Sequence, residues 1–254
     1  MPIDDSMIRI RIVEEFVAEI ATVDSVAGLK RALLRAKVAM GFDYFALTHH
    51  ADILDPRSKV IRIHDYPEIW AGQFDLRRLG RVDPVHRASH TQNNGFLWSQ
   101  IGGMIQMRPE DWAIIELARQ YGIGEGYTVP ANVPGESNGS VSFAMAIGKP
   151  IPEHMLMAAS DIARRAFDCA RNLWRMRPPP LGIPLLTPAQ IICARWTMVG
   201  KSAWEISQIE GYKKSTAERH LKHARERYGV EKQTLLITKA LLDGTLSLGD
   251  FATM

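Results

Sequence analysis

Aromatic hydrogen-bond donors gather near an aspartate that precedes a proline in a single stretch of the chain. The run YPEIWAGQFDLRRLGRVDPV contains Tyr66, Trp70 and Asp83, and Trp98 follows in FLWSQ. A Trp ring only donates, a Tyr hydroxyl donates and accepts, and an ionised Asp only accepts. This set suits a neutral amphiphile with two carbonyls and one N–H, held in an otherwise apolar pocket. The residues alone leave an alternative open: the aromatic residues are core residues and Asp-Pro starts a helix or turn.

A second group of chemically distinctive residues lies in KKSTAERHLKHARERYG, residues 213–229. Residues 213–228 hold six Lys or Arg against two acidic residues. Residues 181–254 carry ten basic and seven acidic residues, whereas the charges of residues 1–180 sum to zero. Residues 181–254 therefore account for the whole net charge of +3. A local basic excess is typical of nucleic-acid binding, and the alternative is a solvated helix face.

Catalytic and metal-binding patterns are weak. The histidine pairs 49–50 and 220/223 lack the Cys or carboxylate partners that complete a metal site. The segment GIGEG does not form a phosphate-binding pattern, and no nucleophile–base pair or nucleophile elbow is evident. We therefore expect no catalytic residue, no metal and no cofactor.

The composition is typical of a globular protein, with 46% hydrophobic and 23% charged residues among 254. The chain has no apolar run long enough for a membrane span, and its first residues lack the apolar core of a signal peptide. The two cysteines, Cys169 and Cys193, lie far apart and suit small core residues in a reducing compartment. We expect a cytoplasmic protein without membrane association.

The segment RMRPPPLGIP predicts a linker over residues 175–184, because its prolines and glycine cannot continue a helix. Residues 1–174 precede it and alternate between helical and strand patterns. Expected helices cover residues 6–21, 26–40, 109–122 and 153–176, and expected strands cover 42–49, 59–66, 126–130 and 139–148, with a turn at 53–58 between the first two strands. Hairpins flanked by helices indicate an antiparallel sheet covered on both faces, an α/β/α sandwich.

Residues 185–254 show helical patterns only and read as four short helices. Capping boxes are expected at Thr187, Ser202 and Ser215, each followed three residues later by Gln or Glu. A short helix, a turn with Gly211 and a basic helix form the helix-turn-helix arrangement. If the third helix starts at Ser215, it has one apolar face and one basic face. The apolar face would comprise Ala217, Leu221, Ala224 and Tyr228. The fold class is therefore α+β, with an all-α C-terminal domain.

The segment LLTPAQIICARWTMVGKSAWEISQIEGYKKSTAERHLKHARERYGV resembles the helix-turn-helix domain of LuxR-type quorum-sensing regulators, especially their TraR-like branch. The shared features include the Leu-Thr-Pro opening, RW, GKS, the Ser-Thr pair and YGV. Gln190 stands where Glu is usual, and it can still close a capping box. Ala194 stands where Leu is usual, which is a packing change that the first helix must absorb.

The resemblance extends through residues 1–174, which it identifies as an autoinducer-binding domain for a small molecule. It implies that Trp70 binds the lactone carbonyl of an N-acyl-homoserine lactone, that Asp83 binds the amide N–H, and that Tyr66 binds the acyl carbonyl. It also implies that Trp98 lines the lactone end.

Three further positions follow from the same resemblance. Gly126 matches a family glycine, and Ser142 matches a hydroxyl that binds the acyl carbonyl. Phe74 stands where Tyr is common, and the missing hydroxyl leaves the preference for acyl chains open.

The expected function is that of a ligand-responsive transcription factor. Its expected partners are an acyl-homoserine lactone, double-stranded DNA and a second copy of the chain, with RNA polymerase as a further candidate. The expected phosphate contacts are Lys201, Ser202, Ser215 and Thr216, and the expected base contacts are Arg219, Lys222 and His223. Glu218 either accepts from cytosine or repels a phosphate. Two alternatives stay open: a regulator that responds to a non-lactone ligand or binds DNA without one, and an enzyme fused to a DNA-binding module.

Overall fold

The computed structural model describes residues 5–50, 61–133, 137–173 and 185–247, which fall into two compact units. The first unit ends, among the described residues, at 173, and the second begins at 185. The expected linker at 175–184 and the expected turn at 53–58 lie outside the described residues. The second expected strand is shorter than the sequence pattern suggests, because its described part pairs only over Arg62–His64.

An antiparallel sheet forms the centre of the N-terminal unit. The described strands are β1 (Tyr44–His49), β2 (Arg62–His64), β3 (Phe96–Leu97), β4 (Ile123–Ala131) and β5 (Gly139–Ala146). Their order across the sheet is β2-β1-β5-β4-β3, and each neighbouring pair is antiparallel. The central strand β5 is a run of small and apolar residues that is buried along nearly its whole length, as expected for a strand covered on both faces.

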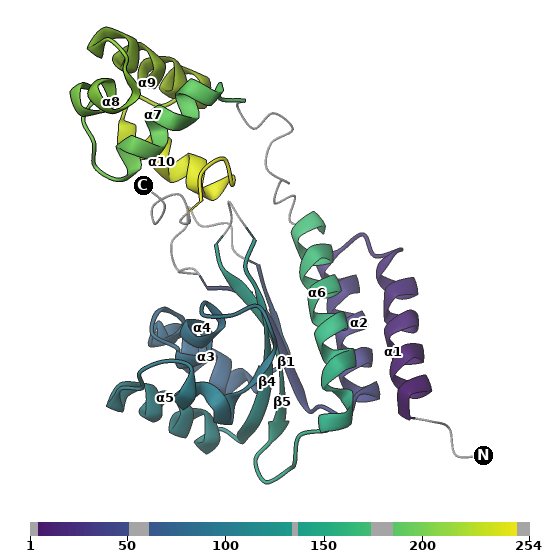
Figure 1. Cartoon of the computed structure of the whole chain (residues 1–254). Helices are drawn as coiled ribbons and strands as arrows, with labels where there is room; N and C mark the ends of the chain where they lie inside the picture. Colours follow the sequence, from purple (N-terminus) through teal and green to yellow (C-terminus); the bar gives the residue numbers. More distant parts are fainter. Residues whose placement is uncertain (1–4, 51–60, 134–136, 174–184, 248–254) are drawn as a thin grey trace. The chain divides into compact units, whose positions relative to one another are not determined.

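Helices cover both faces of this sheet (Figure 1). On one face lie α1 (Asp5–Ile20), α2 (Val26–Ala39) and α6 (Leu156–Leu173). On the other lie α3 (Glu68–Leu76), α4 (Pro84–Ser89) and α5 (Pro109–Gln120), with the short 3₁₀ helices η1 (Leu79–Arg81) and η2 (Trp98–Gly103); a third, η3 (Glu153–Met155), precedes α6. The predicted α/β/α sandwich is confirmed.

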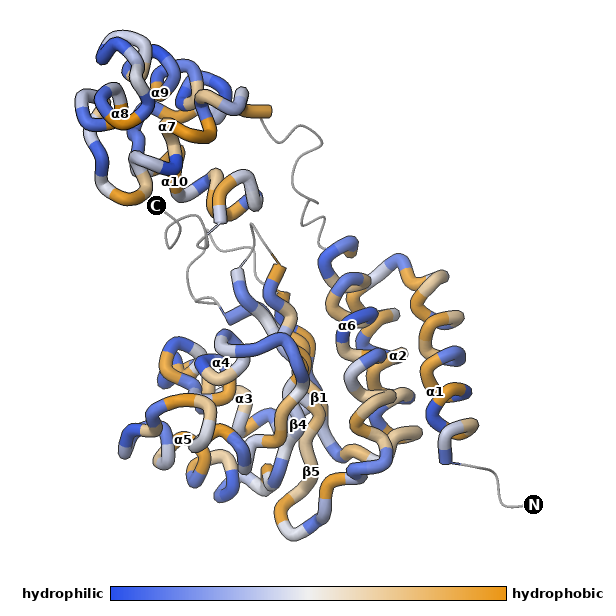
Figure 2. The backbone as a smooth tube through the Cα atoms, in the orientation of Figure 1, coloured by the Kyte–Doolittle hydropathy of each residue, from blue (hydrophilic) through white to orange (hydrophobic). Residues whose placement is uncertain are grey.

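The larger core lies between the sheet and the layer of α1, α2 and α6. Leu29 and Leu33 of α2, Phe45 of β1 and Phe143 of β5 have no exposed surface there. The strands are accordingly among the most hydrophobic segments in Figure 2, whereas α9 of the second unit is largely hydrophilic. Along β5, Phe143 faces this core and Ser142 faces the opposite layer, because successive side chains of a strand point to opposite faces of the sheet.

The described part of the C-terminal unit contains four helices, as predicted. They are α7 (Pro188–Met198), α8 (Ala203–Glu210), α9 (Lys214–Tyr228) and α10 (Gln233–Leu242). Two predicted capping boxes are present: Thr187 exchanges hydrogen bonds with Gln190, and Ser202 with Glu205. Ala194 is fully buried, so the small residue is accommodated in the packing of α7 against α9 and α10.

The third predicted capping box is wrong. The helix begins at Lys214 and its N-cap is Lys213, so Ser215 lies inside the first turn. The turn is short because Gly211 adopts a left-handed conformation (φ 69°) that ends α8 at once. Lys213 has no side-chain acceptor and makes no side-chain cap. The buried stripe of α9 is nevertheless as predicted: Ala217, Leu221, Ala224 and Tyr228.

Candidate ligand pocket and nucleic-acid face

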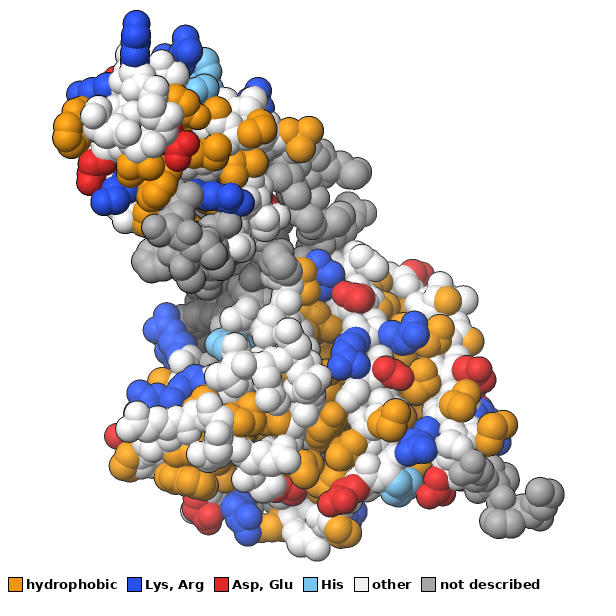
Figure 3. Space-filling model, viewed as in Figure 1, with side chains coloured by type: hydrophobic (Ala, Val, Ile, Leu, Met, Phe, Trp, Pro, Cys, Tyr) orange, Lys and Arg blue, Asp and Glu red, His pale blue; other side chains and the backbone are white. Residues whose placement is uncertain are grey.

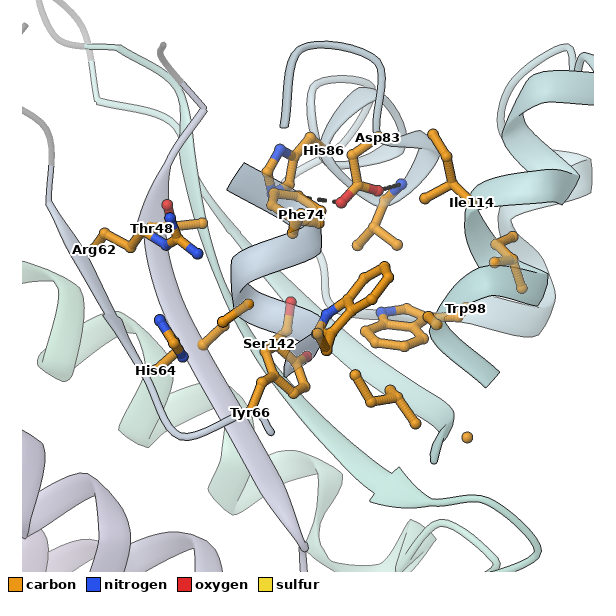
Figure 4. A pocket seen from close by; sticks show the side chains of 18 of the residues that line it. Thr48, Arg62, His64, Tyr66, Phe74, Asp83, His86, Trp98, Ile114 and Ser142 are labelled. Carbon is orange, nitrogen blue, oxygen red and sulfur yellow. Dashed lines mark hydrogen bonds and ion pairs between the residues drawn. The ribbon is translucent and has the colours of Figure 1, made fainter. Parts of the chain in front are cut away.

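A cavity of about 100 Å³ lies in the N-terminal unit between the sheet and the layer of α3, α4 and α5 (Figure 4). A single water molecule needs only about 10–15 Å³, so this space is larger than an ordinary packing defect. The lining combines apolar side chains with a few polar ones. Six of the seven predicted ligand residues line it: Tyr66, Trp70, Phe74, Asp83, Trp98 and Ser142.

Helix α3 supplies the aromatic wall of the cavity. Trp70 and Phe74 are four residues apart, so they project from the same face of the helix. Their rings meet edge to face at 5.6 Å between centroids, and Trp70 also contacts Tyr121 at 6.0 Å. Trp70 is buried and borders the cavity, so its indole forms part of this wall.

Asp83 is both a helix cap and part of the cavity lining. Its Oδ1 accepts a hydrogen bond from the backbone N–H of Val85 at 2.8 Å, which caps α4. Its Oδ2 lies 3.8 Å from Nε2 of His86, longer than a hydrogen bond. The Asp-Pro pair therefore starts a helix, which is the alternative role that the sequence left open for it. The second carboxylate oxygen is still directed to the cavity.

Tyr66 precedes α3 and lines the same cavity. Burial raises the pKa of Tyr66, and the carboxylates of Asp83 and Asp65 raise it further. The hydroxyl therefore keeps its proton throughout the physiological range. It can donate to a ligand carbonyl at any working pH.

Trp98, Thr128 and Ser142 form a hydrogen-bonded chain from η2 to the sheet. Nε1 of Trp98 donates to Oγ1 of Thr128 at 2.8 Å, and Oγ1 of Thr128 lies 2.8 Å from Oγ of Ser142. Because Trp98 only donates, Oγ1 of Thr128 accepts that bond and its own hydroxyl can donate to Oγ of Ser142. The Ser142 hydroxyl is then left to donate to a group in the cavity. The N–H of Trp98 is thus engaged within the protein, and Trp98 presents only its ring to the cavity. Sequence reasoning missed Thr128, although its place opposite Ser142 follows from pairing β4 with β5.

Gly126 is the predicted ligand residue that does not line the cavity. An added Cβ at this position would lie 2.4 Å from Cε2 of Trp98, so only glycine lets the indole rest on β4. Gly126 therefore supports the position of Trp98. Gly124, two residues earlier on the same strand, lines the cavity instead.

Sequence reasoning also missed four polar residues of the lining: Thr48, Arg62, His64 and His86. His86 stacks on His50 at 3.9 Å between ring centroids, and its Nδ1 donates to the carbonyl of Gly80 at 3.1 Å. Arg62 and His64 alternate along β2 with the buried Ile63. Period-two spacing was the available signal, because it places both polar residues on one face.

The side of α9 opposite its buried stripe is exposed and basic. Of the predicted DNA-binding residues on this helix, Thr216 is half-buried and the others are exposed: Ser215, Glu218, Arg219, Lys222 and His223. Figure 3 shows Lys and Arg side chains projecting from the C-terminal unit. Ion pairs are long and solvated: Lys214 with Glu218 at 3.6 Å and Lys222 with Glu226 at 3.8 Å. These cations are therefore accessible to a polyanion.

Lys201 and Ser202 lie at the start of α8, and both side chains already contact Glu205. Oγ of Ser202 donates to Oε2 of Glu205 at 2.8 Å and accepts from its N–H at 3.3 Å, and Nζ of Lys201 lies 3.4 Å from Oε1. A phosphate contact by the Ser202 hydroxyl would compete with its cap.

Other classes of site find no support in the described part of the chain. Residues 5–50, 61–133, 137–173 and 185–247 include no group of three metal-ligating side chains. None of the helices in those ranges is long and apolar enough to cross a membrane.

A unit with an internal cavity, joined to a helix-turn-helix unit with an exposed basic face, is the arrangement of transcriptional regulators that have a sensor domain. The model of the autoinducer-binding-domain family matches residues 25–170. The chain belongs to the LuxR-type quorum-sensing regulators that carry this domain, a family of regulators and not of enzymes.

Named relatives share most of the chain. The chain is 27% identical over 183 residues to the quorum sensing-dependent transcriptional regulator RpaR of Rhodopseudomonas palustris, covering 72% of this chain and 74% of that one. It is 24% identical over 213 residues to the transcriptional activator TraR of Agrobacterium vitis, covering 82% and 90%. The crystal structure of Escherichia coli SdiA has the same fold, with a TM-score of 0.58 and 19% identity over 91% of this chain and 96% of SdiA.

Proposed function

We propose that this protein is a ligand-responsive transcription factor that binds an N-acyl-homoserine lactone in its cavity and a two-fold DNA site as a homodimer. One observation carries the proposal. Tyr66 and Trp70 at α3, Asp83 at the start of α4 and Ser142 on β5 meet around one largely apolar cavity. Together they offer the donors and the acceptor that an acyl-homoserine lactone requires.

Both carbonyls and the amide N–H of the lactone have a partner in this arrangement. The N–H of Trp70 binds the lactone carbonyl, and the hydroxyls of Tyr66 and Ser142 bind the acyl carbonyl. Oδ2 of Asp83 accepts the amide N–H, since Oδ1 is committed to the cap of α4. The acyl chain packs against the apolar lining and adds about 0.8 kcal/mol per buried CH₂. Because only the folded state binds it, the ligand stabilises the fold.

Helix α9 is the proposed recognition helix. Its buried stripe fixes it on α7 and α8, and its exposed face carries Arg219, Lys222 and His223 toward base edges. Lys201 and the first turn of α9, with Ser215 and Thr216, hold phosphates, since helix N-termini favour anions. A two-fold dimer places its half-sites about one helical turn of DNA apart.

The lactone is tested by thermal denaturation and DNA binding with a panel of acyl-homoserine lactones. DNA for the binding assay comes from selection against a random pool. We expect at least one lactone to raise the melting temperature and to tighten DNA binding. Unchanged stability with every lactone, together with intact DNA binding, would refute the lactone proposal and favour a regulator with another ligand or none.

A monoacylglycerol belongs in the same panel. One solved structure with this fold is that of SdiA in complex with octanoyl-rac-glycerol, with a TM-score of 0.58 and 19% identity. Stabilisation by octanoylglycerol but by no lactone would replace the lactone with a neutral lipid ester as the ligand class.

A further inference from the structure

One wall of the cavity is polar where an unsubstituted alkyl chain would need apolar groups. Strand β2 contributes Arg62 and His64 to the lining of the cavity. Ile63 between them also borders the cavity, but it is only 3% exposed and packs in the larger core. Thr48 of the neighbouring strand lines the same wall. In the view of Figure 4 these three residues lie on one side of the cavity, and Asp83 and Trp98 lie on the other.

Two of these three side chains already have partners. The guanidinium of Arg62 pairs with the carboxylate of Asp75. The hydroxyl of Thr48 donates to the backbone carbonyl of His49 at 3.0 Å. Neither group therefore depends on a ligand for its hydrogen bonds.

His64 differs from both. Its Nδ1 is buried and has no hydrogen-bond partner among the described residues. Its ring packs against that of Tyr66, with centroids 6.5 Å apart and an interplanar angle of 26°. A buried polar atom left without a partner is costly, and such an atom beside a cavity indicates a partner that binds there.

The protonation state of His64 limits the chemistry of that partner. Burial lowers the pKa of His64, and the charges of Arg62 and Lys30 lower it further, against the opposing effect of Asp75 and Asp65. The imidazole is therefore neutral near pH 7 and has one donor and one acceptor. A neutral hydroxyl or carbonyl oxygen suits it, whereas an anion gains little.

The register of the sheet locates this group relative to the acyl carbonyl. His64 pairs with Ala46, and Ala46 pairs with Ser142 on the next strand. Two strand spacings separate the backbone of His64 from that of Ser142, a distance of about 10 Å. A ligand whose acyl carbonyl meets Ser142 therefore reaches His64 with a more distal part of its acyl group.

We propose that His64 determines ligand specificity by hydrogen bonding an oxygen that the acyl group carries beyond its carbonyl. The preferred ligand is then an acyl-homoserine lactone with a polar acyl group rather than an unsubstituted alkanoyl lactone. This proposal rests on the proposed function, because it assumes that a lactone occupies the cavity.

The test is calorimetric titration of the full chain with lactones of one chain length. One lactone is unsubstituted, and the others carry a hydroxyl that moves one carbon at a time away from the amide. We expect one of the hydroxylated lactones to bind the wild-type protein about tenfold more tightly than the unsubstituted one, the gain of one hydrogen bond in a buried site.

Variants then assign that preference to His64. His64→Leu removes both hydrogen-bonding atoms, and we expect the tenfold preference to disappear while the unsubstituted lactone still binds. His64→Gln keeps a donor and an acceptor and should retain part of the preference. His154→Leu is the matched control, because His154 is exposed in the same unit and does not line the cavity.

Two results would overturn the proposal in distinguishable ways. If the wild-type protein binds the unsubstituted lactone most tightly, or if His64→Leu keeps the wild-type ranking, His64 does not select the ligand although the lactone site stands. If the wild-type protein binds none of the lactones, the proposed function itself fails and this proposal fails with it.

Discussion

Replacement of Asp83 by Asn separates the two roles of this carboxylate. Oδ1 caps α4 through the N–H of Val85 at 2.8 Å, and Oδ2 is the proposed acceptor for the ligand amide. Asn and Asp are about equally good at the N-cap, so the amide oxygen can take over the cap. The amide nitrogen then occupies the place of Oδ2 and presents a donor to a ligand donor.

The size of the effect follows from the bond that is lost. A hydrogen bond to a charged group contributes about 1.5–3 kcal/mol. At about 1.4 kcal/mol per factor of ten, Asp83→Asn should weaken lactone binding by about 10- to 100-fold. The unliganded protein should keep its free energy of unfolding to within about 0.5 kcal/mol, because the cap remains.

The assay combines calorimetric titration of the lactone with thermal denaturation of the unliganded protein. Asp161→Asn is the control, because Asp161 is exposed on α6 and its carboxylate lies 3.7 Å from the solvated guanidinium of Arg164, away from the cavity. Asp83→Ala should lose both functions, with an added loss of stability of about 0.5–2 kcal/mol from the missing cap. Lactone affinity equal to wild type in a folded Asp83→Asn protein would remove Asp83 from the site.

Three further predictions concern the ion pair between α4 and α5, the strand under Trp98, and α9. Arg87→Ala should lower the free energy of unfolding by about 1.5–3 kcal/mol, measured by urea denaturation at neutral pH, because Asp111 is 1% exposed and accepts from Arg87 at 2.7 Å. Burial raises the pKa of Asp111, but hydrogen bonds from Arg87 and from a backbone N–H outweigh this effect and leave the pKa below its usual value. The difference in free energy of unfolding between wild type and Arg87→Ala should therefore persist above about pH 4 and shrink as the carboxylate protonates at lower pH. Gly126→Ala should displace Trp98 and weaken lactone binding, seen as a shift in tryptophan fluorescence and a higher Kd, and unchanged values would contradict the close contact. Arg219→Ala should cost about 1–3 kcal/mol in DNA binding and relax preference at one base position, whereas an even loss over all sequences would make Arg219 a phosphate contact.

Local patterns predicted the elements of this fold well. The four-residue spacing of the apolar residues in α9 follows directly from helix geometry, and the capping boxes at Thr187 and Ser202 mark helix starts by their own hydrogen bonds. Ser215 misled the prediction, because its spacing to Glu218 matches a capping box. The backbone instead enters the helix earlier, at Lys214, after the left-handed Gly211.

The cavity was only partly predictable, because its lining depends on strand register. The aromatic and acidic residues of α3 and α4 lie in one run of sequence, so their types drew attention to them. Thr128 and His64 become part of the cavity only when β4 and β2 take their places in the sheet. Gly126 shows the reverse case: the sequence placed it at the ligand, and the structure places it under Trp98.

The most direct test of the account is mass spectrometry of the small molecule that co-purifies with the full chain after exposure to native extract. We predict that the wild-type protein retains an N-acyl-homoserine lactone and that the Asp83→Asn protein, handled in the same way, does not. Retention of a compound of another class by the wild-type protein, or equal retention of a lactone by both proteins, would contradict the account.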